Sequence, residues 1–378
     1  MRIVVIGITH PFRGGIAHHT TCLSHALSKH HDVTLLSLTS QYPSLLFPGQ
    51  TQIDHSDNAF TFPNRPLLHP LNPLSWLKAW RLIRRITPDL VIIPWWHPYF
   101  APMMGTLALL LQRFGSTQVL FLCHNAQPHE SSWIDGLLLR YAYAFPSGFL
   151  VHSHKDRQRL QRYVTSRPIM VHPHPVYEIF TADDPPDRSS ARERLGVTGK
   201  KVVLCFGYIR RYKGVDVLLE CFLNDQLDQE SHLLLVGEFY DDRDHYQKSI
   251  DRLLQQNRLT LVDRYVSNEE VPLYFSAADL VAAPYLSASQ SGVIQIARAF
   301  NTPVVASDVG GLTEMIQSDR SSWLCPPGDP EQLALTISKA FTTLEKGVST
   351  ETPPHTDDSW HSMVSAIETF HNAQSKER

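Results

Sequence analysis

The chain has 378 residues, of which 43% are hydrophobic and 19% charged, with a formal net charge of −3. This length is sufficient for two α/β domains that each bury a core of their own. A general nucleic-acid-binding protein would be basic, so the slightly acidic balance argues against that class and no nucleic-acid partner is expected.

The five cysteines are far apart, odd in number and set in apolar surroundings. This pattern is typical of reduced core residues in a cytoplasmic protein rather than of a disulfide framework. The amino terminus reads as a first strand and not as a signal peptide. The longest apolar run, residues 101–111, is too short to span a bilayer. We therefore expect a cytoplasmic protein with at most a peripheral association with the inner face of the membrane.

Strands and helices alternate through the first half of the chain. Strands are predicted at residues 3–8, 33–37, 90–93, 119–122 and 148–151, and helices at residues 16–28, 74–86, 101–113 and 132–145. The proline-rich stretch at residues 42–73 is expected to be irregular. Alternation of this kind predicts a parallel sheet that is covered by helices on both faces.

A polar, proline-rich stretch at residues 173–189 is the predicted linker, and a second alternating set follows it. Its strands are predicted at residues 202–206, 233–236, 259–262, 280–283 and 304–306, with helices from Val215 and at residues 246–256, 269–276 and 293–300. A last helix is expected at residues 359–372. The prediction is α/β: two doubly wound domains, residues 1–180 and 190–355, facing each other across a cleft, with a carboxyl-terminal helical segment at residues 356–378.

The segment GVIQIARAFNTPVVASDVGGLTE, which begins at Gly292, predicts a glycine-opened helix at a sheet edge. The first turn of such a helix presents backbone N–H groups and partial positive charge to an anion. Ser291, Gly292 and Val293 are therefore candidate phosphate-binding positions. Glu314 opens the following helix, where a carboxylate suits the helix dipole, and it is a candidate donor-side residue.

A second phosphate-type loop, FGYIRRYKG, follows the predicted strand at residues 202–206. Arg210 offers a planar fork of donors and Lys213 a point charge, which together suit a departing pyrophosphate. The alternative is a solvated basic turn, which is the simpler interpretation of Arg211. Together the two loops predict a nucleotide diphosphate sugar as the bound donor.

In the first half, Gly14 and Gly15 follow the first strand, where adjacent glycines let the backbone approach a ligand. Their spacing does not match GxGxxG, which disfavours a dinucleotide dehydrogenase. His124 follows the predicted strand at residues 119–122 and is expected to face a sugar; the alternative is a structural histidine bonded to a carbonyl. The candidate acceptor-side residues are His97, His129 and Glu130.

No metal is expected. The twenty histidines show no recognisable ligand spacing, and the acidic run at residues 241–244 is more simply a solvated loop that caps a helix. Asp279 is expected to be a structural hydrogen-bonding group rather than a catalyst. Residues 74–87 would form a helix with tryptophans on one side and basic side chains on the other, which suits either packing on a sheet or contact with an anionic membrane.

Three segments together resemble glycosyltransferase family 4, a group of retaining enzymes with the two-domain GT-B fold: FGYIRRYKG, YFSAADLVAAPY and SGVIQIARAFNTPVVASDVGGLTEMI. The resemblance implies that Gly14 and Gly15 lie near the donor phosphate and sugar and that His124 contacts the sugar. It implies that Arg210 and Lys213 bind the diphosphate. The last helix, with Trp360, is implied to cross back to the first domain.

The sequence departs from the family pattern at two glutamates. Ser287 and Gln295 stand in their places, and Gln295 can still exchange hydrogen bonds with the ribose hydroxyls. Tyr208 replaces a family arginine, whose role passes to Arg210. The base is expected near Val266.

The predicted function is metal-independent, retaining transfer of a hexosyl unit from a UDP- or GDP-linked sugar to a hydroxyl of a glycan or lipid-linked acceptor, in cell-surface polysaccharide or glycolipid synthesis, with no cofactor. Two alternatives stay open. One is a nucleotide-sugar epimerase or hydrolase on the same fold. The other is a non-catalytic nucleotide-sugar-binding subunit, which the missing glutamates favour.

Overall fold

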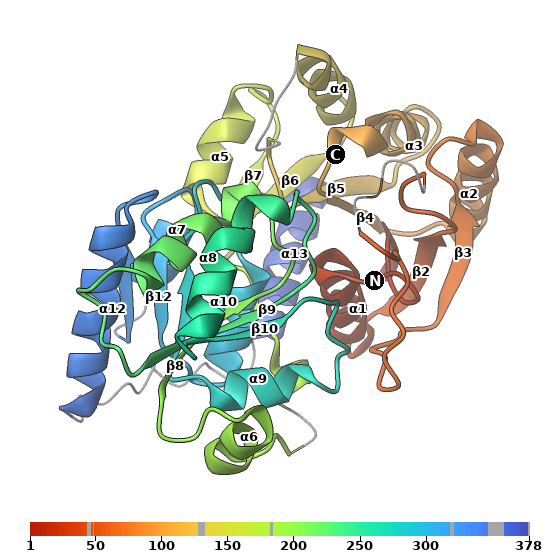
Figure 1. Ribbon diagram of the computed structural model, residues 1–378. Helices are drawn as coiled ribbons and strands as arrows, with labels where there is room; N and C mark the ends of the chain where they lie inside the picture. The colour runs from red at the N-terminus through yellow and green to blue at the C-terminus, as the bar shows by residue number, and fades with distance from the viewer. Residues whose placement is uncertain are drawn as a thin grey trace. The chain divides into compact units, whose positions relative to one another are not determined.

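The computed structural model describes residues 1–43, 47, 49–127, 133–181, 184–317, 321–346 and 359–376. The chain forms two units, each with an α/β arrangement of its own (Figure 1). The first comprises Met1–His55, Ala59–Pro175 and Asp358–Arg378, and the second Ser56–Asn58 and Val176–Asp357. The carboxyl-terminal helix therefore belongs to the amino-terminal unit.

The first unit is built on a seven-stranded sheet in the order β3-β2-β1-β4-β5-β6-β7, and every neighbouring pair is parallel. The strands are β1 (Arg2–Gly7), β2 (Asp32–Leu38), β3 (Asn64–Leu68), β4 (Leu90–Trp95), β5 (Gln118–Cys123), β6 (Gly148–Val151) and β7 (Ile169–Val171). Its helices are α1 (Gly15–Ser28), α2 (Pro73–Ile86), η2 (Pro98–Phe100), α3 (Ala101–Arg113), α4 (Trp133–Tyr143), α5 (His154–Gln161) and the carboxyl-terminal α13 (Ser359–Lys376).

Alternate residues of β1 point to the two faces of this sheet, as the twofold pleat requires. Val4 and Ile6 pack in the core beneath α2, α3 and α4, whereas Ile3 and Val5 pack in the core beneath α1 and α13. Four residues of α13 complete that second core: Met363, Val364, Ile367 and Phe370. The sheet is buried on both faces, which explains its continuous runs of Val, Ile and Leu.

The predicted first-half elements are present with shifts of one or two residues, but four others were missed. Residues 64–68 form β3 inside the stretch expected to be irregular, and the sequence pattern did not predict η2, α5 or β7. β3 (NRPLL) is an edge strand that contains a proline, and β7 has only three residues. Short edge strands carry little hydrophobic periodicity, so pattern reading overlooks them.

The second unit has a six-stranded parallel sheet in the order β10-β9-β8-β11-β12-β13. The strands are β8 (Lys201–Phe206), β9 (Ser231–Val236), β10 (Leu259–Val262), β11 (Leu280–Ala283), β12 (Val304–Ser307) and β13 (Ser322–Cys325). The helices are η3 (Glu178–Phe180), α6 (Arg188–Leu195), η4 (Arg211–Lys213), α7 (Val215–Phe222), α8 (Asp244–Gln255), α9 (Val271–Ala277), α10 (Gly292–Ala299), α11 (Leu312–Gln317) and α12 (Pro330–Glu345). The sequence pattern did not predict η3, α6, η4, β13 or α12.

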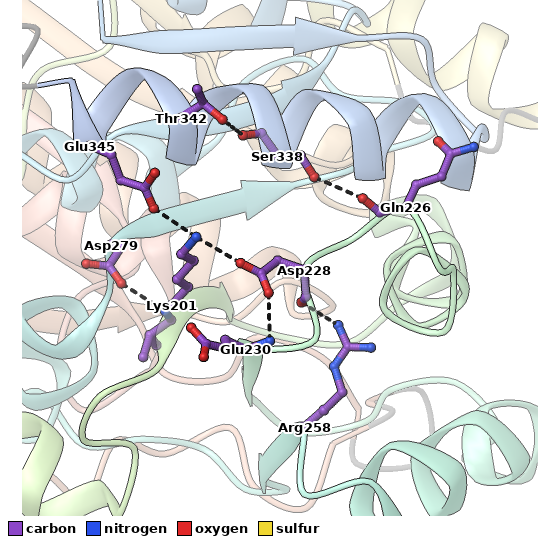
Figure 2. Close-up of polar contacts among 10 residues, drawn as sticks. Lys201, Gln226, Asp228, Glu230, Arg258, Asp279, Ser338, Thr342 and Glu345 are labelled. Atoms are coloured by element: carbon purple, nitrogen blue, oxygen red, sulfur yellow. Dashed lines mark hydrogen bonds and ion pairs between the residues drawn. The ribbon is translucent and has the colours of Figure 1, made fainter.

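Polar side chains tie the segments around the amino end of β8 together (Figure 2). Lys201 bridges Asp228 and Glu345, with Nζ–O distances of 2.8 Å to each. The buried Arg258 donates to the carbonyls of Phe222 and Asp228 at 2.7 and 3.1 Å. Asp279 accepts the Val202 amide at 2.8 Å and pairs with Arg192, which confirms its predicted structural role.

Each sheet reverses its strand order once, between β1 and β4 in the first unit and between β8 and β11 in the second. In open parallel sheets, ligands bind outside the carboxyl ends of the strands at such a switch point. The loops that follow β8 and β11 are residues 207–214 and 284–291, and these contain Lys213 and Ser291. The second sheet thus brings the two predicted phosphate loops to neighbouring strands.

Candidate donor site and a buried histidine cluster

The Lys213 ammonium lies beside the first turn of α10. A β-carbon placed on Gly207, the residue after β8, would lie 3.1 Å from Lys213 Nζ and 3.6 Å from Val293 Cγ2. Gly207 has a φ of 94°, in the region that favours glycine. The end of β8, the Lys213 side chain and the start of α10 therefore surround one point.

Tyr285 joins the same two loops. Lys213 Nζ lies 5.7 Å from the centroid of the Tyr285 ring, and the Tyr285 hydroxyl lies 3.1 Å from Ser291 Oγ. The Leu286 amide donates to the Tyr212 carbonyl at 2.7 Å. These contacts hold loop 207–214 against loop 284–291 and fix the position of Lys213 relative to α10.

Two positions near these loops require glycine, because a neighbouring backbone carbonyl lies too close for a side chain. Gly214 has a φ of 65°, and a β-carbon there would lie 2.0 Å from the Pro284 carbonyl oxygen. A β-carbon on Gly310, the first glycine of the pair after β12, would lie 1.5 Å from the Ala288 carbonyl oxygen. Both glycines allow a neighbouring strand-end loop to approach more closely than any side chain would permit.

The Lys213 ammonium has a pKa below the ordinary value for lysine. Burial lowers its pKa to about 8, and the positive charge of Arg210 acts in the same direction. Desolvation disfavours the charged form, so an anion that restored the lost solvation would be bound favourably. Arg210 is exposed, and its guanidinium lies 5.8 Å from the centroid of the Tyr240 ring.

The amino end of α10 carries two buried polar side chains. Gln295 is 1% exposed, and its Oε1 and Nε2 atoms have no hydrogen-bond partner among the residues that the structure describes. Ser289 Oγ is also buried and has no hydrogen-bond partner among the described residues. Ser291, the residue before α10, makes no side-chain cap, so the first-turn amides are not occupied by its hydroxyl.

Two further donor candidates lie on other elements of the second unit. Val266 is buried in the loop between β10 and α9, which an ion pair of 2.5 Å between Arg264 and Glu270 holds in shape. Arg264 keeps the pKa of the Glu270 carboxyl at about 2. Glu314 lies in the first turn of α11 and is half-buried.

In the first unit, Gly14 precedes α1 with a φ of 109°, and Gly15 is its exposed first residue. The preceding loop pairs with residues 52–54: the Arg13 amide donates to the Gln52 carbonyl at 3.1 Å, and the Asp54 amide to the Pro11 carbonyl at 2.7 Å. The glycine pair thus stands at the carboxyl end of β1, on the switch-point side of the seven-stranded sheet.

His124 follows β5 as predicted, and it lies in a cluster of histidines. Its ring centroid is 4.5 Å from that of His19 and 5.5 Å from that of His152, and only 3% of the residue is exposed. Burial lowers the pKa of His124 to about 3. The sequence did not predict this cluster, because its members come from separate elements. The available signal was the recurrence of histidine just after strand ends, at His124, His152 and His172.

The proposed acceptor residues are only partly described. His97 is exposed and precedes η2, where its Nδ1 accepts the Tyr99 amide at 3.1 Å, so the ring serves as a helix cap. His129 and Glu130 lie outside the described residues.

The acidic run at residues 241–244 has structural partners. An Asp241 carboxylate oxygen accepts the Arg211 amide, and Asp242 Oδ1 accepts the Asp244 amide at 3.1 Å at the start of α8. Among the described residues, the one group that could hold a metal ion lies elsewhere, in the histidine cluster. The two hydrogen bonds of Asp241 and Asp242 agree with the loop-and-cap interpretation of the run.

Helix α2 packs its apolar side on the sheet of the first unit. Ala79 and Ile83 are fully buried, and Trp76, Trp80 and Ile86 pack at the edge of the core. The basic side is exposed: Lys78, Arg81, Arg84 and Arg85. In the part of the chain that the structure describes, no helix combines the length and apolar character needed to cross a bilayer.

Two glycosyltransferase family models each match most of one half of the chain. The model described as Glycosyltransferase Family 4 matches residues 13–177, and the one described as Glycosyl transferases group 1 matches residues 200–343. The chain belongs to glycosyltransferase family 4. The resemblance noted in the sequence is thereby confirmed.

Curated relatives match within a part of the chain. A D-inositol 3-phosphate glycosyltransferase of Nocardioides sp. is 35% identical over 184 residues, which are 45% of this chain and 40% of that protein. The mannosylfructose-phosphate synthase of Agrobacterium fabrum is 30% identical over 165 residues, 41% of this chain and 35% of that protein. The chain thus spans less than half the length of these two relatives.

Solved structures match over the full length and establish the GT-B fold. Anabaena Alr3699/HepE in complex with UDP-glucose has a TM-score of 0.71 at 17% identity, with 100% of both chains covered. The catalytic domain of starch synthase IV from Arabidopsis thaliana, bound to ADP and acarbose, has a TM-score of 0.72 at 14% identity, covering 100% of this chain and 99% of that one.

Proposed function

We propose that this family 4 member is a retaining glycosyltransferase that moves a sugar from a nucleotide diphosphate sugar to an acceptor hydroxyl. The observation that carries the proposal is the convergence of the Lys213 ammonium and the first turn of α10 beside Gly207. A cation and backbone N–H groups around one point suit the diphosphate of such a donor. Relatives bound to UDP-glucose and ADP support a nucleotide-linked donor.

Each donor group has a proposed partner on the second unit. The diphosphate would bind Lys213, Arg210 and the amides of Ser291, Gly292 and Val293. The ribose hydroxyls would bind Gln295, whose buried carboxamide has no hydrogen-bond partner among the described residues. Leaving such a group unsatisfied costs roughly 1–3 kcal/mol, which a bound ribose would recover. The base would lie near Val266, and Glu314 would lie on the donor side.

The transferred sugar would be contacted by Gly14, Gly15 and His124 of the first unit. Catalysis would be mainly electrostatic: the bond between the anomeric carbon and the diphosphate oxygen breaks, and the bond to the acceptor oxygen forms on the same face. The acceptor proton passes to the departing diphosphate. Lys213 stabilises the charge that the diphosphate gains, and the proposed transfer uses no metal or cofactor.

The proposed acceptor is the hydroxyl of a glycan or a lipid-linked glycan, with His97, His129 and Glu130 on the acceptor side. The exposed basic face of α2 supports contact with an anionic membrane surface, and Leu71 and Leu74 beside it are 60% and 69% exposed. We place the protein in the cytoplasm, in polysaccharide or glycolipid synthesis. Loss of vesicle binding in an Arg81→Glu, Arg84→Glu variant would support this contact.

The donor is tested by thermal-shift screening against UDP-, GDP-, ADP- and CDP-linked sugars, followed by NMR of the product anomer. We expect one nucleotide class to raise the melting temperature. Lys213→Ala should abolish that rise, whereas Lys248→Ala, on the exposed side of α8, should retain it. Unchanged donor binding in Lys213→Ala would remove the diphosphate assignment.

The replacement of both family glutamates, by Ser287 and Gln295, favours one second candidate, a non-catalytic nucleotide-sugar-binding subunit. Donor binding without turnover over a wide acceptor panel would favour that reading. Release of free sugar, or of an altered sugar nucleotide, in the absence of acceptor would instead indicate a hydrolase or epimerase.

A further inference from the structure

Four histidines of the first unit gather in its interior, at the carboxyl edge of the seven-stranded sheet. His19 lies on α1, His124 follows β5, His152 follows β6, and His174 lies in the segment after β7. Their exposed fractions are 0%, 3%, 7% and 7%. Histidine is often partly exposed, so four buried imidazoles in contact call for a chemical explanation.

Three of these rings are close enough to share one ion. The His19 ring centroid lies 4.5 Å from that of His124 and 5.1 Å from that of His174. One nitrogen from each of His19, His124 and His174 lies within 4.8 Å of the corresponding nitrogens of the other two. Zinc–imidazole bonds are about 2.0–2.1 Å long, so modest side-chain rotation would bring the three nitrogens onto one ion.

The hydrogen bonds around the cluster fix which nitrogens carry protons. His174 Nδ1 lies 2.8 Å from the Pro175 carbonyl, and His152 Nδ1 lies 3.0 Å from the His172 carbonyl. A carbonyl oxygen only accepts, so each of these Nδ1 atoms carries a proton. A ring N–H bound to a carbonyl is the usual outer partner of a metal-ligating histidine.

His19 is the member of the cluster whose polar atoms are least satisfied. It is fully buried, and neither of its ring nitrogens has a hydrogen-bond partner within the described ranges. Each buried polar atom left in this state costs roughly 1–3 kcal/mol. A metal ion bonded to one ring nitrogen of His19 would remove part of that cost. Neutral imidazole is the form that binds a metal.

We propose that His19, His124 and His174 bind one divalent transition-metal ion of the zinc and cobalt class, with His152 packed against the three ligands. An all-imidazole ligand set favours these ions over magnesium or calcium, which prefer oxygen ligands. The ion would connect α1 to the segments that follow β5 and β7.

The test begins with the unaltered chain, purified without a polyhistidine tag and stripped with a chelator. Titration with cobalt(II) should show one equivalent bound, with the intense visible absorption of a tetrahedral site, and zinc(II) should displace it. Zinc should also raise the melting temperature. Failure to bind a stoichiometric ion, or a cobalt spectrum that stays that of the hydrated octahedral ion, would overturn the proposal whether or not donor is bound.

Single variants then assign the ligands. His19→Ala and His174→Ala should each weaken cobalt binding by about 100-fold or more. His25→Ala is the matched control, because His25 is exposed on the same helix α1 and should leave the affinity unchanged. Circular dichroism establishes whether each variant is folded. Equal cobalt affinity in a folded His19→Ala variant would contradict the assignment of His19 as a ligand. If a variant does not fold, the titration of the unaltered chain decides whether the metal site exists.

Discussion

At the scale of single residues, the proposed donor site of the second unit combines groups that reduce the stability of the unliganded protein. Lys213 carries an ammonium whose pKa burial lowers to about 8, and Gln295 holds a buried carboxamide with no hydrogen-bond partner among the described residues. Polar groups of this kind are costly without a ligand and become favourable when one binds. The sequence identified both residues. The partial burial of Lys213 and the full burial of Gln295 follow from the packing of α10 against β11 and beside Gly207.

Lys213→Met should therefore stabilise the unliganded protein. The folded-state pKa of about 8 lies below the unfolded value of 10.5, so folding is penalised while the ammonium is charged in both states, below pH 8. That penalty disappears as the pH rises from 8 to 10.5. We expect a gain of about 1 to 2 kcal/mol at pH 7, after allowance for partial solvent screening, and none above pH 10.5.

Denaturant unfolding at pH 7 and at pH 10.5 measures this difference. Lys248→Met, which removes an exposed lysine from α8, is the control and should change little at either pH. Destabilisation of Lys213→Met at pH 7 would show that the ammonium is well solvated or paired in the folded state.

At the scale of elements, two glycines with nearly the same backbone conformation have different surroundings. Gly214 ends η4 with a φ of 65°, and Gly196 ends α6 with a φ of 66°. A β-carbon would lie 2.0 Å from the Pro284 carbonyl oxygen at Gly214, whereas nothing lies within 4 Å of one at Gly196. Loop 207–214 is thus fixed by a tertiary contact in addition to its local conformation.

Gly214→Ala should consequently cost about 3 kcal/mol or more of stability, from left-handed strain plus overpacking against loop 284–291. Gly196→Ala should cost about 1 kcal/mol, from the strain alone. Thermal unfolding of the two variants separates the cost of the left-handed strain from the cost of the overpacking. Equal losses would mean that the Pro284 contact relaxes without cost.

The loop between β10 and α9 offers a test by pH. Arg264 holds the pKa of Glu270 at about 2, below its ordinary value of 4.5. The stabilisation is present above pH 4.5 and is lost as the pH falls to 2. Because Arg264 is 50% exposed and Glu270 33% exposed, Glu270→Gln should cost only about 0.5 kcal/mol at pH 7.

The difference between Glu270→Gln and the unaltered chain should vanish near pH 2. Unfolding by denaturant between pH 2 and pH 7 provides the measurement. A difference that does not depend on pH would assign the effect to packing instead of to the ion pair.

At the scale of the whole molecule, each unit has a parallel sheet with one switch point, and the first unit is completed by the carboxyl end of the chain. Helix α13 covers the same face of the sheet as α1 (Figure 1). A β-carbon on Gly148 would lie 2.4 Å from Phe370 Cε2, so the helix packs directly on β6. The core of the first unit is therefore assembled from both ends of the sequence.

Ile367→Ala should destabilise the first unit by about 3 kcal/mol through the cavity it leaves. The second unit has separate cores and should keep its stability. Hydrogen exchange read by mass spectrometry should show faster exchange in β1 and β5 but not in β8 or β11. Leu335→Ala, at a 47% exposed position of α12, is the control. Faster exchange throughout the chain would mean that the units unfold together.

The sequence by itself determined the two alternating α/β sets, because buried parallel strands and amphipathic helices leave strong local periodicities. It also marked the two loops that are proposed to bind phosphate, since glycines before a helix and paired basic residues are visible locally. It missed β3 and β7, which are short edge strands with weak patterns.

The tertiary structure decided which distant residues come together. Strand order placed β8 beside β11 and so brought Lys213 to α10, and it gathered His19, His124, His152 and His174, which lie up to 155 positions apart, into one buried cluster. Contacts over such separations depend on how strands pair, which no local pattern specifies.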